Sequence, residues 1–164
     1  MKITITDILN VADSAQPFSG MIDLRWVKRR DQALFPDELA IGGEVANRAG
    51  VVTLRYQISG AMVYDCERCM MQAERPFQET FSHIVVRTLE DEELDDAYLI
   101  APQGVLDLAD RASADLLLDL PQVLVCRADC KGLCPQCGAD LNQTNCGCRR
   151  PNVDPRLEKI NELL

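Results

Sequence analysis

Apolar and polar residues alternate through much of the first half of the chain. The clearest run extends from Val52 to Ser59, where every second residue from Val52 to Ile58 is large and apolar. Shorter runs of the same kind occupy residues 3–6 and 22–26. Because successive side chains of a strand point to opposite faces of a sheet, a period of two residues is typical of half-buried strands. The first half of the chain is therefore predicted to form a β-sheet.

Two turns are expected to connect these strands. Residues 47–50, Asn-Arg-Ala-Gly, are typical of a tight turn and predict a hairpin between a strand near residues 38–46 and the run from Val52. The alternation continues to Tyr64, and apolar residues return at residues 77–86. Residues 66–69, Cys-Glu-Arg-Cys, are therefore expected at the tip of a long antiparallel hairpin.

Helical patterns appear in the second half of the chain. Residues 107–120 are rich in good helix formers, start with Asp107 as a plausible N-cap and stop before Pro121. Apolar residues recur there every four positions, so this helix is expected to pack on the sheet. Residues 87–104 indicate an irregular acidic loop, and residues 154–164 a C-terminal helix with Pro155 at its first position.

Together these elements predict an α+β fold. Residues 1–121 are expected to form a twisted antiparallel sheet or a partial barrel, with the helix at residues 107–120 packed against it. Residues 122–164 are expected to form a cysteine-rich, zinc-bound extension that ends in the C-terminal helix and is integrated with this core. A chain of 164 residues with 47% hydrophobic residues can bury such a core.

The eight cysteines carry most of the recognisable chemistry. Residues 134–138, Cys-Pro-Gln-Cys-Gly, have the sequence of a zinc knuckle, in which Gly138 is expected to be left-handed and to point its amide at a bound sulfur. Thiolates at such spacings bind tetrahedral zinc with Zn–S distances of about 2.3 Å. The predicted ligands are Cys66, Cys69, Cys130, Cys134, Cys137, Cys146 and Cys148, with Cys126 as a further candidate.

The spacing leaves the number of zinc ions open. Eight thiols can fill two four-sulfur sites, and one site made by Cys66, Cys69 and two C-terminal thiols fits equally well. The separation of four residues between Cys126 and Cys130 is less typical of a knuckle. Two other interpretations are buried cysteines that act as small apolar residues and a redox pair at residues 134–137, although no βαβ pattern surrounds that pair.

Charge and apolar patterning indicate the compartment and the class of partner. No run suits a secretory signal or a membrane span, so we expect a cytoplasmic protein with reduced thiols and no membrane partner. The net charge of −9 disfavours general binding to nucleic acid. Six acidic residues lie at residues 90–96, where a solvated loop is expected. The candidate contacts to RNA or to a partner are Lys28, Arg29, Arg30, Lys131, Arg149 and Arg150.

Patterns typical of catalysis are missing from the sequence. The chain contains no GxSxG, Walker A, HExxH or GxGxxG motif. His83, the only histidine, shares the parity of Phe77 and Phe81 on the predicted strand and is expected to be structural. We therefore expect a protein that is not an enzyme and has no small-molecule substrate.

A series of landmarks follows a specific order along the chain: Cys66-Glu67-Arg68-Cys69, Leu120-Pro121, residues 130–138, Asp140-Leu141-Asn142 and residues 154–164. This series resembles the YceD family of bacterial and plastid proteins, which is linked to the accumulation of large-subunit ribosomal RNA. The resemblance spans nearly the whole chain and is to the cysteine-rich branch of the family. It implies a role in ribosomal RNA accumulation or large-subunit assembly, and it implies no catalytic residues.

Three functions are compatible with the sequence. The leading hypothesis is a non-enzymatic factor for large ribosomal subunit biogenesis, with zinc as a structural cofactor. Its partner would be large-subunit ribosomal RNA, a ribosomal protein or an assembly factor. The second hypothesis is a zinc-dependent interaction module in another pathway. The third is a thiol-based redox sensor.

Overall fold

The computed structural model describes residues 1–88 and 98–148. The chain divides into two compact units. The first unit consists of Met1–Tyr64 and Gln72–Leu124, and the second consists of Asp65–Met71 and the chain from Val125 onward. The acidic run at residues 90–96, Arg149, Arg150 and the predicted C-terminal helix at residues 154–164 lie outside the described residues.

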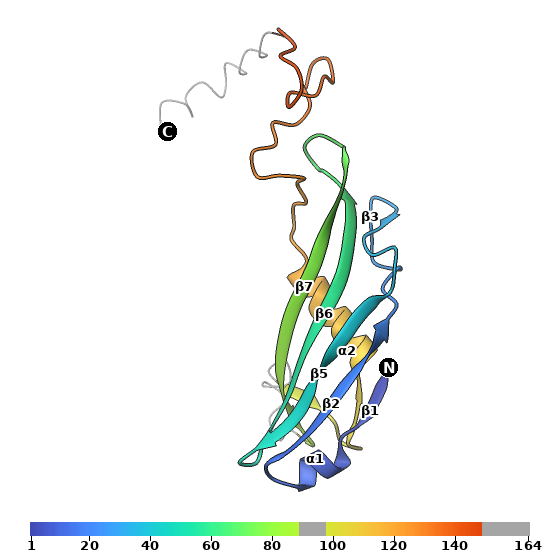
Figure 1. Cartoon of the computed structure of the whole chain (residues 1–164), viewed down its shortest axis with the longest axis vertical. Helices are drawn as coiled ribbons and strands as arrows, with labels where there is room; N and C mark the ends of the chain where they lie inside the picture. Colours follow the sequence, from blue (N-terminus) through green and yellow to red (C-terminus); the bar gives the residue numbers. More distant parts are fainter. Residues whose placement is uncertain (89–97, 149–164) are drawn as a thin grey trace. The chain divides into compact units, whose positions relative to one another are not determined.

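A five-stranded sheet with the order β2-β5-β6-β7-β8 forms the framework of the first unit (Figure 1). A helix, α2, accompanies this sheet, and two short ribbons pair β1 with β9 and β3 with β4. The strands are β1 Lys2–Thr4, β2 Ser14–Ile22, β3 Lys28–Arg29, β4 Gln32–Ala33, β5 Leu39–Arg48, β6 Val51–Asp65, β7 Gln72–Val86, β8 Tyr98–Ile100 and β9 Val105–Asp107. The helices are α1 Thr6–Asn10 and α2 Leu108–Asp119.

The sheet is open and mixed. β2 pairs with β5, and β5 with β6, in antiparallel orientation, whereas β8 pairs with β7 in parallel. Among the described strands, β2 and β8 form the two edges, so the sheet does not close. The predicted sheet with a packed helix is therefore confirmed; the sheet does not close into a barrel, and the parallel β7–β8 pair is the exception to the expected antiparallel pairing.

The turn between β5 and β6 has the predicted position. Arg48 pairs with Val51, and the two residues between them have positive φ, 51° at Ala49 and 88° at Gly50. Two successive positive φ angles suit the right-handed twist of a hairpin, and glycine adopts one without steric cost. The side chain of Asn47 accepts from Gly50 N at 3.0 Å, which helps to hold the turn.

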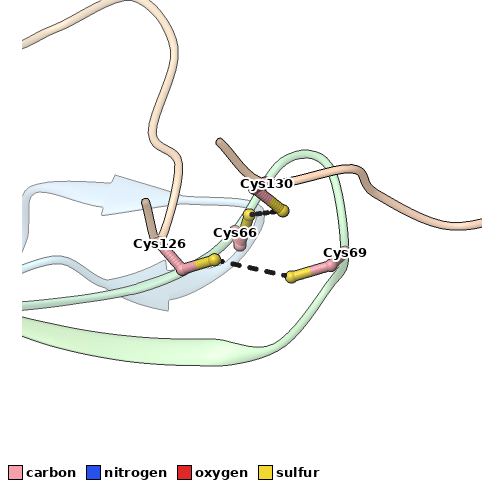
Figure 2. A group of neighbouring side chains, drawn as sticks. All are labelled: Cys66, Cys69, Cys126 and Cys130. Atoms are coloured by element: carbon pink, nitrogen blue, oxygen red, sulfur yellow. Dashed lines mark hydrogen bonds between the residues drawn. The ribbon is translucent and has the colours of Figure 1, made fainter. Parts of the chain in front are cut away.

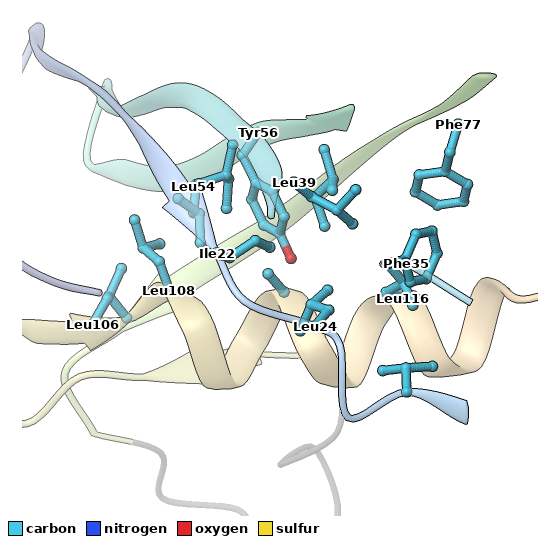
Figure 3. Packing of buried hydrophobic residues seen from close by; sticks show 14 of the residues in the cluster. Ile22, Leu24, Phe35, Leu39, Leu54, Tyr56, Phe77, Leu106, Leu108 and Leu116 are labelled. Atoms are coloured by element: carbon cyan, nitrogen blue, oxygen red, sulfur yellow. The ribbon is translucent and has the colours of Figure 1, made fainter. Parts of the chain in front are cut away.

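Alternation along β6 places one of its faces in the core. Leu54, Tyr56 and Ile58 are at most 1% exposed, as the sequence pattern predicts. Leu108 and Leu116 of α2 lie on the side of the helix that faces these residues (Figure 3). The helix agrees with the predicted one to within a residue at each end, and the Asp107 side chain accepts from two amides of the first turn. Such an N-cap satisfies donors that have no partner within the helix.

One polar cluster is buried between the sheet and α2. Asp115 is 5% exposed and accepts from the Tyr56 hydroxyl and from Arg111 Nε at 2.9 Å. His83 Nε2 lies 2.6 Å from Asp115 Oδ2. Burial alone would raise the pKa of Asp115, but its hydrogen bonds with Arg111 and Tyr56 and the nearby His83 hold that pKa below its usual value. His83 thus lies in a structural interface of the first unit.

Several local features differ from the sequence-based expectation. β2 ends at Ile22, and Trp26 is 56% exposed, so residues 22–26 do not form one half-buried strand. The elements that were not predicted are α1, β2, β3, β4, β8 and β9. Within the described residues, no helix is long and apolar enough to cross a membrane.

Candidate metal centre

The turn between β6 and β7 carries the first two cysteines, as the sequence predicts. Cys66 N donates to Met71 O at 2.9 Å, and Met70 N donates to Cys66 O at 2.8 Å. Met70 has a φ of 61°, which lets the chain reverse within the turn. The four-residue turn brings Cys66 and Cys69 to the same side, in the arrangement that a chelating pair needs.

The segment after α2 completes a group of four thiols. The Cys66 and Cys130 sulfurs are 3.8 Å apart, and the Cys69 and Cys126 sulfurs are 3.7 Å apart. All four sulfurs lie within 4.8 Å of one another, and their side chains converge on a common point (Figure 2). A tetrahedron with Zn–S bonds of about 2.3 Å has sulfur–sulfur edges of about 3.8 Å. We call these residues the first tetrad; their separations suit one ion and exceed the ~2.05 Å of a disulfide.

Neighbouring groups hold the two halves of the first tetrad together. Arg68 Nη1 donates to Cys130 O at 3.0 Å, so a side chain from the β6–β7 turn binds the backbone of the later segment. Leu133 N donates to Arg68 O at 3.0 Å in the opposite direction. Asn142 Nδ2 donates to Cys130 Sγ at 3.5 Å. A donor to a ligating sulfur orients the ligand and stabilises its negative charge.

A second tetrad forms entirely within the C-terminal segment. It consists of Cys134, Cys137, Cys146 and Cys148, whose sulfurs also lie within 4.8 Å of one another. Cys134 is buried and Cys146 half-buried, whereas Cys137 and Cys148 are exposed. In the first tetrad, by contrast, only Cys126 is not fully buried.

The turn of the second tetrad differs in one detail from the prediction. Gly138 is left-handed, with a φ of 73°, as expected. Its amide donates to Cys134 O at 2.9 Å and not to a sulfur. The amides of Cys137 and Gln136 instead hydrogen-bond the Cys134 sulfur. The tight turn therefore directs the amides of Gln136 and Cys137 toward the Cys134 sulfur. The Gly138 amide instead forms the backbone hydrogen bond that closes the turn.

The environment of the thiols favours one thiolate in each tetrad when no cation is bound. Burial would raise the pKa of Cys66, but the amides of Cys126, Cys69 and Arg68 outweigh it and lower that pKa to about 6. The amides of Cys137 and Gln136 lower the pKa of Cys134 to about 6. One other thiol in each tetrad, that of Cys126 or Cys148, is harder to ionise. Burial and the adjacent thiols raise the pKa of Cys126 to about 12, and Cys137 and Cys146 raise that of Cys148 to about 12.

These shifts explain what each tetrad can do chemically. Several thiolates within 4.8 Å repel one another, so the second and later ionisations require a positive charge at the centre. A divalent ion supplies that charge and deprotonates a coordinating thiol. The two tetrads therefore fit metal binding by charge as well as by distance. The structure groups the eight cysteines as two sets of four, a partition that the spacing had left open, and Cys126 belongs to the first.

The candidate basic contacts are distributed over both units. Arg29 donates to Pro121 O at 3.0 Å and to Gln122 O, so its guanidinium takes part in packing of the first unit. Lys28 is exposed. Lys131 lies in the second unit, where its amide donates to Asn142 Oδ1 at 2.8 Å. Sequence reasoning missed Asn142 and Arg68 as supporting residues, since a single Asn or Arg between cysteines has no distinctive pattern.

Comparison with known proteins places the chain in a family. The family described as Large ribosomal RNA subunit accumulation protein YceD matches residues 54–164. The chain belongs to the YceD family. The matched range begins within β6 and contains both tetrads.

Individual relatives agree with this assignment. YlbN of Bacillus subtilis (strain 168) is 23% identical over 166 residues, which cover 100% of this chain and 96% of YlbN. Rv2926c of Mycobacterium tuberculosis (strain H37Rv) is 33% identical over 111 residues, 65% of this chain and 53% of that protein. ML1660 of Mycobacterium leprae is 26% identical over 110 residues. The match spans about half the length of the mycobacterial relatives, and no solved structure matches the chain.

Proposed function

We propose that this YceD protein is a non-enzymatic factor that supports the accumulation of large-subunit ribosomal RNA during assembly of the large ribosomal subunit. The family match over residues 54–164 carries the proposal. That range contains the β6–β7 hairpin from Leu54 onward, α2 and all eight cysteines. A cytoplasmic location with reduced thiols is part of the proposal, because metal coordination needs free cysteines.

The metal in this proposal is zinc, with one ion in each tetrad. Four thiolates at tetrahedral separations are the donor set of structural zinc sites. Such a site is closed, since no coordination position is left for water or substrate. This donor set supports a structural role for the metal and a function without catalysis.

We further propose that the direct partner is a basic protein, such as a ribosomal protein or an assembly factor. Four thiolates around a divalent ion carry a net charge of −2, so two filled tetrads take the formal net charge of the chain from −9 to −13. The guanidinium groups of Arg29 and Arg68 are engaged by backbone carbonyls. The acidic run at residues 90–96 adds to a charge that repels RNA and attracts basic protein surfaces.

Depletion of the protein in its host tests the proposed function. We expect the ratio of large-subunit to small-subunit ribosomal RNA to fall and precursors of the large subunit to accumulate on sucrose gradients. The wild-type gene and a Ser82→Ala control, at an exposed position of β7, should restore the ratio. An unchanged ratio in depleted cells would instead favour a zinc-dependent interaction module in another pathway.

Crosslinking within cells separates a protein partner from an RNA partner. We expect the main crosslinks to join this chain to a basic protein of the large-subunit precursor. The control replaces Lys28, Arg30 and Lys131 by Gln, which should leave the association with precursors largely intact. A strong loss of association in this variant, together with a steep salt dependence, would show direct contact with RNA phosphates.

The redox hypothesis is favoured by the backbone amides that lower the pKa of Cys66 and Cys134 to about 6, because the thiolate is the reactive form of cysteine. Metal coordination would protect these thiolates from modification. We expect the purified, metal-containing protein to react slowly with a thiol-alkylating reagent and to react quickly after treatment with a chelator. Rapid alkylation before chelation, with reversible disulfide formation, would support a redox sensor instead.

A further inference from the structure

The loop that connects the two halves of the second tetrad contacts the first tetrad. This loop joins Cys137 to Cys146 and contains Asn142. Asn142 Nδ2 donates to Cys130 Sγ at 3.5 Å, and Asn142 Oδ1 accepts from Lys131 N at 2.8 Å. One side chain in the loop of the second tetrad therefore binds a sulfur of the first tetrad and the backbone beside it.

Backbone hydrogen bonds hold the same loop against the segment that follows Cys130. Leu141 N donates to Gly132 O at 3.0 Å, and Cys134 N donates to Ala139 O at 2.8 Å. Gly132 lies between Cys130, the last cysteine of the first tetrad, and Cys134, the first cysteine of the second. Both tetrads are thus attached to one short hydrogen-bonded ribbon, and a shift of the loop displaces Asn142 from Cys130.

The orientation of the Asn142 amide is fixed from within the loop. Asn142 N and Nδ2 donate to Asp140 Oδ1 at 2.9 and 2.7 Å. A metal ion in the second tetrad fixes Cys137 and Cys146, the two ends of the loop. An ordered loop presents Nδ2 to Cys130 at little further entropic cost, whereas a loop with free ends must first be ordered. Binding at one tetrad therefore prepares the hydrogen bond that supports the other.

We propose that the two tetrads bind their metal ions cooperatively and that Asn142 is the positioning residue that couples them. This inference rests on the metal binding proposed above and adds that the centres are loaded as a pair. The coupling is reciprocal, so filling either tetrad raises the affinity of the other by the same factor. Couplings between binding sites typically amount to about 5- to 150-fold in affinity.

Titration of the full chain with Co²⁺ tests the coupling. Tetrahedral cobalt–thiolate bands in the absorption spectrum report occupancy, and elemental analysis reports the number of ions bound. The variant Cys146→Ser with Cys148→Ser removes the second tetrad. We expect the first tetrad of this variant to bind Co²⁺ about 5- to 150-fold more weakly than in the wild type. An unchanged affinity would overturn the cooperativity.

A double-mutant cycle tests the role of Asn142. We expect Asn142→Ala to weaken Co²⁺ binding at the first tetrad in the wild-type background and to have little effect once Cys146 and Cys148 are replaced. Equal losses in the two backgrounds would mean that Asn142 supports Cys130 alone, which overturns its coupling role. Asn145→Ala is the matched control, because it truncates an exposed amide side chain of the same loop and should change neither affinity.

A third variant separates donation to sulfur from simple packing. Asn142→Asp retains an acceptor for Lys131 N but turns a carboxylate oxygen toward the Cys130 thiolate. We expect it to weaken the first tetrad more than Asn142→Ala does, whereas a packing role predicts the opposite order. Amide exchange in β6 and α2 shows that each variant retains the first unit. Two independently bound ions would overturn only this inference; absence of bound metal would overturn the proposed zinc centres as well.

Discussion

Within residues 1–88 and 98–148, the first unit buries 24 apolar residues in one continuous cluster, whereas the buried cluster of the second unit consists of Cys66, Cys69 and Cys130. Each fully buried aliphatic or aromatic side chain stabilises a fold by about 1.5–3 kcal/mol. A small segment with few such residues needs another source of stability, and a structural metal is a common one. We therefore expect truncation of buried apolar side chains to destabilise the first unit. Removal of metal should destabilise the second unit.

The largest expected effect is that of metal removal on the second unit. Structural zinc contributes apparent binding free energies of about 10–16 kcal/mol in small domains, and this energy becomes folding energy. We expect a chelator to abolish amide protection at residues 65–71 and 125–148 while the sheet core and α2 stay protected. Hydrogen exchange with mass spectrometry measures both regions in one sample. A simultaneous loss of amide protection in β6 and α2 would show that the stability of both units depends on metal.

The second prediction concerns Asp115 in the first unit. Asp115→Ala leaves the buried Tyr56 hydroxyl and the half-buried Arg111 guanidinium without their acceptor, and breaking such a cluster costs about 3–5 kcal/mol. Denaturant unfolding of the first unit should show this loss, with no change in metal content. Asp119→Ala, an exposed position at the end of the same helix, is the control and should change stability little.

The lowered pKa of Asp115 gives this cluster a defined pH dependence. Because the folded-state pKa lies below that of the unfolded chain, the stabilisation is fully present above about pH 4 and is lost as the pH falls through the folded-state value. Metal centres release their ions when thiolates are protonated. On acidification we therefore expect the second unit to lose protection first. The reverse order would contradict the assignment of stability to metal in that unit.

The third prediction tests the junction between the halves of the first tetrad. Gly132 has a φ of 76°, and a Cβ there would lie 2.9 Å from Arg68 O. Gly138 has a similar φ of 73°, but a Cβ there meets no atom within 4 Å. A left-handed conformation costs roughly 1–2 kcal/mol for a residue other than glycine. Gly132→Ala should therefore weaken Co²⁺ binding more than Gly138→Ala does. Similar losses of Co²⁺ affinity in the two variants would show that the cost of the left-handed backbone, and not the contact with Arg68, determines the effect.

The smallest expected effect is at the start of α2. Asp107→Ala removes the N-cap and should lower the stability of the first unit by about 1 kcal/mol. Asp107→Asn keeps a capping oxygen but loses the charge that faces the N-terminal amine at 3.6 Å. We expect thermal unfolding to show a clear loss for Ala and a smaller one for Asn. Equal losses would assign the effect to the charge.

Features encoded by local patterns could be predicted from the sequence. The β6–β7 hairpin follows from residue alternation, and α2 follows from its Asp107 cap and the proline after it. α1 has five residues, too few for a helical period to appear in the sequence, and no side chain caps it. β8 has three residues and depends on parallel pairing with β7, which is a property of the tertiary structure.

The grouping of the cysteines could not be predicted for a similar reason. Cys126 and Cys130 join the pair at Cys66 and Cys69 because the chain returns to the β6–β7 turn after α2. The spacing of the cysteines along the sequence does not indicate that the chain returns to this turn. The second tetrad is local and its knuckle was recognisable, although the path of the Gly138 amide depends on the details of the turn.

The long separation within the first tetrad has a consequence for synthesis of the chain. Cys69 and Cys126 are 57 residues apart, and β7, β8, β9 and α2 all lie between them. At about 5–20 residues per second, a ribosome needs about 3 to 11 s to add these residues. During that interval Cys66 and Cys69 offer only half of a coordination shell. An ion bound at this site would therefore be fully enclosed only after β9 and α2 of the first unit have been translated.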